Sequence, residues 1–475
     1  MTEDRFLHLA EGIFYGSVRI FYLIFFWRNN MSELNIDKYL ENKKGVPINP
    51  FIFFVMRQVV ARSQAAPMNV HVVNNTDINK TKGPILVFSN HTSRCDWEYI
   101  GMAIKKPMNF VASNIEFHRA HMHAIFKICK VIPKKNFVSD FHCIKEIIQI
   151  TKAGGSVLLF PEGKSSISGT NQPITPGTGK LVKKLGIPVY TTKITGGYMS
   201  NTQWNIANRP GKVIITVNQL YTAEQVKDPS LTAEKIEEAI SESIWNDDFE
   251  WNKEARIKFA GNDTVANKLE EHLFWCPKCH NELSMHGEGN KFKCTACGNG
   301  VTINEYYDLI PDSPECLVPK NMRVWYELQR RYVYRMIRDN PDFCIEEKTK
   351  IGTEPADHYV DKTVTAEIFG EGVMKLTRKE FSFTGTKSAT GEPFEIHCPT
   401  TALISMVMST DSSYFGGFFN GIYYEFQPER KVITKWLLAI EEAHRLAGGV
   451  WQNNIPQQQW IYEDDKPTDK QDYYL

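Results

Sequence analysis

An alternation of short apolar runs with amphipathic stretches, between about residues 66 and 262, constrains the fold of this chain more than any other feature. Five runs have the composition of buried strands: PILVFS, NFVAS, SVLLF, IPVYTTKI and KVIITVNQL. Between and after them, the apolar spacing of CDWEYIGMAI, FHCIKEIIQITKAG, TGKLVKKLG and LTAEKIEEAISESI predicts helices. Strands that alternate with helices are typical of a wound α/β fold. We therefore predict an α/β domain over residues 66–262, with a mixed, largely parallel sheet flanked by helices.

The remainder of the chain divides into further regions by composition. Residues 1–65 hold two aromatic-rich runs, IFYGSVRIFYLIFFW and NPFIFFVMRQVV, which we predict to be helices. The first run is interrupted by Arg19 and is shorter than the roughly 20 apolar residues that span a bilayer. Helices lying in the membrane interface are therefore predicted, with two core helices as the alternative. The other regions are a cysteine-rich segment at 263–310, a helical linker at 311–355, a β-rich domain closed by a helix at 356–450, and a polar tail without stable structure at 451–475.

The charge balance of the whole chain conceals a basic domain. Lys and Arg number 55, as do Asp and Glu, so the net charge is zero. Between Lys80 and Leu220, however, 19 basic residues face six acidic ones, and this segment carries +13. A basic domain predicts an anionic ligand or an anionic lipid surface. The overall neutrality argues against a general nucleic-acid binder, and scattered cysteines outside one cluster predict a reducing, cytoplasmic compartment.

Four of the ten cysteines form the pattern CPKCHNELSMHGEGNKFKCTAC. Two CxxC pairs at this separation supply four thiolates with the spacing of a closed, structural zinc site. The short runs around the second pair predict a zinc ribbon. A site with four protein ligands has no open position, so we expect a structural zinc ion and no catalytic metal. The predicted ligands are Cys276, Cys279, Cys294 and Cys297.

The stretch NHTSRCDW follows the first predicted strand and permits two interpretations. Ser93 can cap a helix with Asp96 at its third position, a variant of the capping box, which leaves His91 as an ordinary loop residue. Alternatively, His91 in the loop and Asp96 in the first helical turn form a hydrogen-bonded pair. A carboxylate that accepts from one imidazole nitrogen makes the other nitrogen a general base.

A second polar group follows another predicted strand, in SVLLFPEGKSS. Glu162 comes directly after the apolar run, as His91 does, and the carboxyl ends of parallel strands form the ligand crevice of a wound sheet. Alone, the Pro-x-Gly turn favours a structural explanation, because such turns are common at strand ends. Lys164 and two serines follow Glu162 and predict a cradle for an anion.

Three segments in order, NHTSRCD, FPEGKSS and GIPVYTTKI, resemble the N-H-x4-D, F-P-E-G-T-R-S and V-P-I-x-P boxes of the glycerolipid acyltransferase family, which includes the 1-acylglycerol-3-phosphate acyltransferases. The resemblance covers about 80–220. It implies an α/β acyltransferase domain in which His91 deprotonates the acceptor hydroxyl and Asp96 orients His91. It also implies that Glu162 and Gly163 help to hold the glycerol acceptor, with Pro188 in the last box.

The sequence departs from this family at two places. In the phosphate-binding segment, where the family has an arginine, KVIPKKN offers Lys134 and Lys135. In the FPEG box, Lys164 and Ser165 stand where the family has Thr-Arg, and loss of a bidentate arginine is not neutral. We predict that these residues contribute to the acceptor site, although the identity of the acceptor stays open.

The resemblance predicts an enzyme that moves a fatty acyl group from acyl-CoA or acyl carrier protein to the hydroxyl of a glycerol phosphate or lysophospholipid. The acceptor that the resemblance favours is 1-acylglycerol-3-phosphate, giving phosphatidate at a membrane surface, with peripheral or monotopic association. The strand–helix order of the C-terminal domain resembles pleckstrin-homology-like domains. One alternative is a catalytically inactive lipid-binding scaffold that uses the ribbon and this domain, and another, disfavoured by charge, is a zinc-ribbon nucleic-acid binder.

Overall fold

The computed structural model describes residues 35–360, 364–449, 455–464 and 472–475. The predicted helix within residues 13–27 lies outside the described residues. Helix α2 (Ile36–Asn42) begins with an N–H that donates to the carbonyl of Ala356. The chain forms two units, which are residues 1–42 with 356–358, and residues 43–355 with 359–475.

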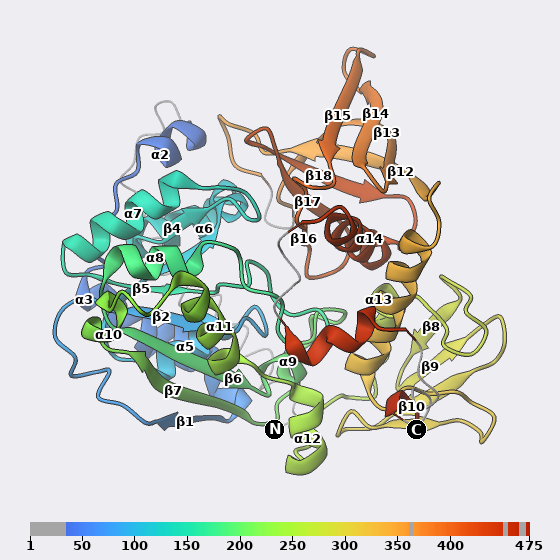
Figure 1. Cartoon of the computed structure of the whole chain (residues 1–475), viewed down its shortest axis with the longest axis horizontal. Coiled ribbons are helices and arrows are strands. Elements are labelled where there is room, and N and C mark those ends of the chain that lie inside the picture. The colour runs from blue at the N-terminus through green and yellow to red at the C-terminus, as the bar shows by residue number, and fades with distance from the viewer. Residues whose placement is uncertain (1–34, 361–363, 450–454, 465–471) are drawn as a thin grey trace, which may run out of the picture. The chain divides into compact units, whose positions relative to one another are not determined.

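The predicted α/β sheet is present in the larger unit as a seven-stranded mixed sheet (Figure 1). Its order is β1-β7-β6-β2-β5-β3-β4, and all neighbours run parallel except β6 and β7. The five predicted strands are confirmed, and β1 and β4 add to them at the two edges. The bounds are β1 Val70–Asn74, β2 Leu86–Ser89, β3 Met108–Ser113, β4 Ile132–Lys134, β5 Ser156–Leu159, β6 Val189–Thr195 and β7 Val213–Tyr221.

Helices flank this sheet, and the four predicted ones are confirmed as α5, α7, α8 and α11. The isoleucines of α7 and α11 pack with apolar strand residues in a core of their own, which includes Phe88, Val157, Ile147, Ile150, Ile236 and Ile240. The helix bounds are α5 Asp96–Ala103, η3 Asn114–His118, α6 Ala120–Cys129, α7 Phe141–Lys152, α8 Thr178–Leu185, α9 Gly197–Ser200, α10 Ala223–Lys227, α11 Ala233–Ile244 and α12 Asp248–Ala255.

The second aromatic-rich run of the N-terminal region is helical, as predicted. Asn49 caps α3 by accepting from the N–H groups of Phe51 and Ile52. Phe53 is buried, whereas Phe51 and Phe54 are 70% and 52% exposed, so this helix has one face in the protein and one face in solvent. None of the helices in the described parts of the chain has the length and apolar content needed to cross a bilayer. The segments are α3 Pro50–Met56, η1 Arg57–Ala61, α4 Arg62–Ala65 and η2 Ala66–Met68.

The cysteine-rich segment folds as a small antiparallel sheet with the order β11-β10-β9-β8. A short helical turn, η4 (Leu269–Glu271), precedes it. Phe292 of β9 is fully buried, and its ring meets that of Trp325 edge-on at 5.3 Å, which ties the ribbon to the long helix that follows it. The strand bounds are β8 Met285–Glu288, β9 Lys291–Cys294, β10 Gly300–Ile303 and β11 Leu309–Pro311.

The C-terminal region is a seven-stranded antiparallel sheet with two long helices, as its β-rich pattern predicts. Its order is β15-β14-β13-β12-β18-β17-β16. Strand β12 lies in the range predicted to be a linker, yet it is an inner strand, because its alternating side chains match one buried face. The apolar run at 402–410 forms only the two-residue β16. The bounds are α13 Met322–Arg338, β12 Cys344–Thr353, β13 Glu367–Thr377, β14 Glu380–Lys387, β15 Pro393–Pro399, β16 Val407–Met408, β17 Phe415–Phe419, β18 Ile422–Pro428 and α14 Ile433–Leu446.

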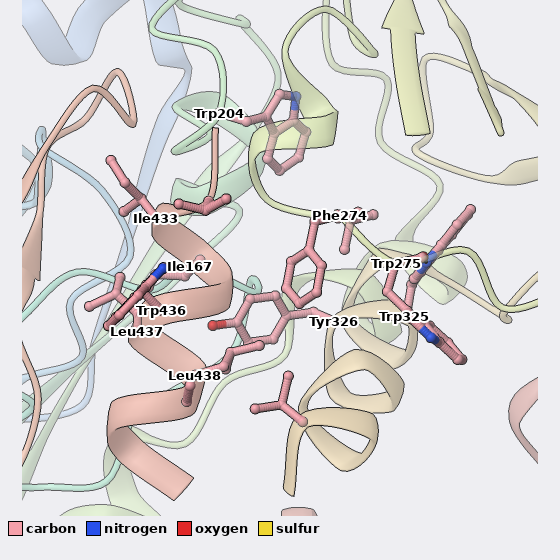
Figure 2. Close-up of a cluster of buried hydrophobic side chains, with 14 of the residues drawn as sticks. Ile167, Trp204, Phe274, Trp275, Trp325, Tyr326, Ile433, Trp436, Leu437 and Leu438 are labelled. Carbon is pink, nitrogen blue, oxygen red and sulfur yellow. The ribbon is translucent and has the colours of Figure 1, made fainter. Parts of the chain in front are cut away.

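One apolar core joins the α/β domain, the ribbon, α13 and α14. Figure 2 shows Leu438 of α14 and Phe274 of the ribbon beside Tyr326 of α13, and Trp436 of α14 belongs to the same cluster. Trp204 of the α/β domain belongs to the same cluster, and its indole N–H donates to the Val265 carbonyl at 2.8 Å. Burying each such side chain stabilises the fold by about 2 kcal/mol, so these parts stabilise one another.

The prediction of an unstructured tail is wrong for its described residues. Residues 456–462 form the 3-10 helix η5 (Pro456–Tyr462), in which Ile461 is fully buried. The ring of Trp460 stacks on that of Tyr473 with centroids 4.2 Å apart. These aromatic side chains supply apolar surface that the polar composition of the tail conceals.

Candidate active site

Asn90 directly follows β2 and extends that strand by means of its side chain. Its amide nitrogen donates to the carbonyl of Ile194 at 2.8 Å, and its amide oxygen accepts from the N–H of Ile194 at 2.7 Å. The side chain thus takes the place of one backbone ladder position between β2 and β6. This anchors the point at which the chain leaves the sheet, and His91 is the next residue.

His91 and Asp96 form the predicted pair. Nδ1 of His91 lies 2.7 Å from Oδ2 of Asp96, with His91 in the loop and Asp96 as the first residue of α5. The Asp96 side chain is 1% exposed and that of His91 is 27% exposed. Because an ionised carboxylate can only accept, Nδ1 carries the proton and Nε2 is the nitrogen able to accept one.

Asp96 is held by the loop that it closes. Its carboxylate accepts from the backbone N–H groups of Thr92 and Ser93 at 2.6 and 3.1 Å, and from both their hydroxyls at 2.7 and 3.0 Å. The hydrogen bonds of the capping-box interpretation are also present, because the Ser93 hydroxyl accepts from the N–H of Cys95 at 3.2 Å and Asp96 accepts from the N–H of Ser93. Only the start of the helix differs, since α5 begins at Asp96 with Cys95 as its N-cap.

Both backbone polar groups of His91 are hydrogen-bonded to the loop after β5. Its N–H donates to Oε1 of Glu162 at 2.9 Å, and its carbonyl accepts from the N–H of Ser166 at 2.7 Å. The imidazole also stacks on the ring of Phe160, with centroids 4.4 Å apart. The two motifs are therefore joined by direct contacts, and the position of the imidazole depends on the loop that contains FPEG.

Glu162 points into the protein. It is fully buried, and its second oxygen accepts from the N–H of Gln172 at 2.6 Å, while Asn171 donates to the first at 3.2 Å. Burial raises the pKa of Glu162 to about 8, against the opposing effect of these donors. Its oxygens thus accept hydrogen bonds from two backbone N–H groups and one amide of the protein itself. The next residue, Gly163, has a φ of +77°, where a side chain would be strained, and a Cβ there would also meet Phe137 at 3.2 Å.

The predicted phosphate-binding segment lies beside the FPEG loop. Asn136 donates to the carbonyl of Gly163, which joins the end of β4 to that loop. Lys134 is half-buried and its ammonium donates to the carbonyl of Lys135 at 3.3 Å. The Lys135 ammonium donates to the carbonyl of Gly421 at 3.0 Å in the C-terminal sheet.

The two residues in the altered part of the FPEG box are also engaged by protein groups. The Lys164 ammonium is buried and forms an ion pair with Glu441 of α14. The hydroxyl of Ser165 accepts a hydrogen bond from the amide of Gln203. Both residues directly precede Ser166, which contacts His91, so both lie near His91.

Pro188 is not brought together with His91. Its carbonyl accepts from the N–H of Leu86 at 3.0 Å, so it lies level with the first residue of β2. His91 lies just beyond Ser89, the last residue of β2, and is on the order of 15 Å further along the strand direction. The carboxyl end of β6 instead presents Gly197, where a Cβ would lie 2.3 Å from the Thr92 hydroxyl. Parallel pairing of β2 and β6 explains this separation.

Residues that the motif analysis did not select also build the site. Asn90 was available as a signal, since an amide at a strand end can imitate a backbone pair. Phe160 could have been suspected as the last apolar residue before the FPEG turn. The roles of Gln172 and Gln203 leave no local signal, because each depends on a contact made across the fold.

Part of the chain matches a known protein family. Residues 69–195 match the family model described as Acyltransferase, and this range contains both His91 and Glu162. These residues form an acyltransferase-family domain.

The acyltransferase-family domain has a curated relative in plants. The chloroplastic 1-acyl-sn-glycerol-3-phosphate acyltransferase of Brassica napus is 24% identical over 189 residues, which cover 38% of this chain. The aligned part is 54% of that relative, so the chain spans about half its length. Among solved structures, the 1-acyl-sn-glycerophosphate acyltransferase PlsC of Thermotoga maritima aligns with a TM-score of 0.38 and 19% identity, over 51% of this chain and 95% of that one.

The four predicted cysteine ligands are brought together in the ribbon. Their sulfur atoms all lie within 4.8 Å of one another. Cys276 and Cys297 are 3.7 Å apart, as are Cys279 and Cys294. A tetrahedral zinc ion with Zn–S bonds of about 2.3 Å has S–S edges of about 3.8 Å. The donor set therefore fits zinc, and four protein thiolates would leave it no site for substrate.

Proposed function

We propose that the protein transfers a fatty acyl group from an acyl thioester to the hydroxyl of a glycerol phosphate or lysophospholipid. The observation that carries the proposal is the 2.7 Å contact between His91 and Asp96, with the imidazole partly exposed at the carboxyl end of β2. The most specific acceptor we propose is 1-acylglycerol-3-phosphate, which would give phosphatidate. Acyl-CoA and acyl carrier protein are both candidate donors.

The reaction would proceed without an acyl-enzyme. Nε2 of His91 takes the proton of the acceptor hydroxyl as its oxygen attacks the thioester carbonyl carbon. The tetrahedral intermediate collapses with cleavage of the C–S bond, and the imidazolium returns the proton to the departing thiolate. Asp96 stabilises the imidazolium throughout.

A nearby thiol does not compete as a nucleophile. Cys95 immediately precedes Asp96, but it is buried and has no cationic partner strong enough to offset that burial. Burial raises the pKa of Cys95 to about 12. A thiol that stays protonated at neutral pH is a poor nucleophile. This supports direct attack by the acceptor hydroxyl.

We propose that the protein works at a membrane surface. The exposed rings of Phe51 and Phe54 lie on one face of α3, followed along the chain by the exposed Arg62. Aromatic side chains next to basic ones suit the interface of an anionic bilayer. Cosedimentation with vesicles containing anionic lipid, compared for the wild type and Phe51→Ser/Phe54→Ser, tests this part of the proposal.

A lipid-binding scaffold without activity is the second candidate. Ser165 stands where the family has its arginine, and this departure is the observation in favour of the scaffold. The two candidates differ in whether the bound lysolipid is consumed.

The decisive experiment is acyl transfer from labelled acyl-CoA, and separately from labelled acyl carrier protein, to lysophosphatidate, glycerol phosphate and other lysophospholipids. We expect product with the wild type and a loss of about 10²- to 10⁴-fold in His91→Ala, which lacks the base. His71→Ala, an exposed histidine of the same domain, is the matched control and should keep its activity. A wild type inactive toward every acceptor would favour the scaffold, and an unaffected His91→Ala would refute the assignment of the base.

A further inference from the structure

Lys164 occupies the position after FPEG at which the related family has threonine, and its ammonium points away from solvent. The Lys164 side chain is 4% exposed, and that of its ion-pair partner Glu441 is 1% exposed. The Lys164 ammonium also donates to the hydroxyl of Ser405 at 3.0 Å. Glu441 lies on α14, 277 residues further along the chain. The lysine thus connects the active-site loop to the C-terminal helix.

The ion pair belongs to a closed network of buried charges. Arg330 of α13 donates to Glu441 at 2.7 Å and to Glu442 at 2.8 Å, and Ser405 donates to Glu441 at 2.7 Å. Two cations therefore face two carboxylates. Removing one member of such a buried set leaves an uncompensated charge, which is strongly destabilising at that place.

The same loop holds His91. Glu162 accepts from the His91 N–H and Ser166 donates to the His91 carbonyl. Lys164 lies between Glu162 and Ser166 in sequence. Its ion pair with Glu441 is therefore two residues away from each of the residues that are hydrogen-bonded to His91. A shift of the loop would therefore be passed to the imidazole through backbone hydrogen bonds.

We propose that Lys164 is a positioning residue, and that its ion pair with Glu441 makes α14 part of the support that holds His91 in place. The inference rests on the acyl transfer proposed above. It means that the lysine of the altered FPEG box binds a carboxylate of the C-terminal helix and not the acceptor phosphate. It also gives the region beyond the acyltransferase-family domain a role in the reaction.

The test compares Lys164→Met, Glu441→Gln and the double variant, assayed below their melting temperatures. Misplacing a catalytic group by about 1 Å costs about 100-fold, so we expect each single variant to lower kcat by about 10- to 100-fold with little change in KM for the acceptor. Both changes break the Lys164–Glu441 ion pair, and Glu441→Gln also weakens the contact with Arg330, so the double variant should lie within about twofold of the less active single variant.

The matched control is Lys435→Met. Lys435 is on the same helix and forms a partly buried ion pair with Glu282 of the ribbon, away from the FPEG loop. It should melt at a lower temperature than the wild type while keeping its kcat. A raised KM in Lys164→Met that Glu441→Gln does not reproduce would overturn the proposal and assign Lys164 to the acceptor. Equal effects of Lys435→Met and Lys164→Met on kcat would also overturn it.

Two further measurements keep the proposal testable if Lys164→Met misfolds or if the wild type is inactive. Lys164→Arg keeps the charge and should recover most of the kcat that Lys164→Met loses. The 15N signals of the His91 ring, assigned among 13 histidines by their absence in His91→Ala, should shift in Lys164→Met and stay unchanged in Lys435→Met. If the wild type transfers no acyl group, the proposed function fails, whereas these signals still test the coupling of Lys164 to His91.

Discussion

Oε1 of Glu162 accepts a hydrogen bond from the backbone N–H of His91 at 2.9 Å, across 71 positions of sequence. The glutamate of the FPEG box therefore acts on the histidine of the first box through its main chain. This contact explains how two short motifs, each weak alone, constitute one site. It also separates the role of Glu162 from that of a substrate ligand.

Replacing Glu162 by glutamine should impair both folding and turnover. The amide would place an N–H₂ group where three N–H donors now converge, and one donor would lose its acceptor. We expect a loss of about 1–3 kcal/mol in the free energy of unfolding, measured by denaturant titration, together with a lower kcat. Glu237→Gln is the control, because Glu237 accepts from the N–H groups of Gly177 and Gly179 and not from that of His91, and should affect stability alone.

Replacing Asp96 by asparagine should leave the chain folded and nearly inactive. The neutral amide cannot stabilise the imidazolium as the carboxylate does, and where its nitrogen takes the position of Oδ2 the imidazole presents its protonated nitrogen to the acceptor hydroxyl. Loss of a comparable aspartate lowers kcat by about 10⁴, and a similar loss is expected in steady-state acyl transfer. Asp77→Asn, at an exposed ion pair with Lys80, should behave like the wild type. Full activity of Asp96→Asn would contradict a general-base role for His91.

The four-cysteine cluster should bind one zinc ion that supports folding. Metal analysis of the purified protein is expected to give one zinc per chain, and Cys279→Ser should lose it. Structural zinc contributes directly to folding free energy, so the melting temperature should fall in that variant and in chelator. Cys344→Ser removes an exposed cysteine outside the cluster and should change neither quantity. Acyl transfer by the folded zinc-free protein at low temperature would agree with a structural metal.

His272 predicts a pH dependence of stability. It is 1% exposed, and neither ring nitrogen has a hydrogen-bond partner among the described residues. Burial lowers its pKa from 6.5 to about 3. The unfolded chain therefore binds a proton that the folded chain excludes, so stability should fall as the pH drops from 6.5 towards 3.

The effect of this one group is at most about 1.4 kcal/mol per pH unit. His272→Phe removes the titrating group while keeping a ring beside Trp204, whose centroid is 5.9 Å away. The difference in unfolding free energy between the two proteins, measured from pH 7 to pH 4, should grow as the pH falls. A constant difference would show that His272 is protonated in the folded protein.

Local pattern was sufficient for the strands and helices around the site. The apolar runs before Asn90 and Pro161 predicted β2 and β5, and parallel pairing then placed His91 and Glu162 at one edge. Strand β1 escaped notice because its side chains are mostly exposed and its sequence, VHVVN, is flanked by asparagines. An edge strand with little burial carries little periodicity.

The partners of individual side chains could not be predicted in the same way. Glu162 and Lys164 were both expected to face a ligand, and both are satisfied by protein groups. The groups that satisfy Lys164 are Glu441 of α14 and the hydroxyl of Ser405, both more than 200 residues away in sequence. Pro188 was placed at the site by the order of the boxes, but the strand direction puts it at the opposite edge. Motif order carries no information about these long-range contacts.

The apolar core that runs from Ile167 through Trp204 and Phe274 to Trp436 affects how the larger unit responds to heat. The ribbon, α13 and the C-terminal sheet share this core, so none of them can release its side chains without exposing those of its neighbours. A scanning calorimeter should therefore record one coincident endotherm for these parts, whereas the sheet of the α/β domain has a core of its own and can melt at another temperature.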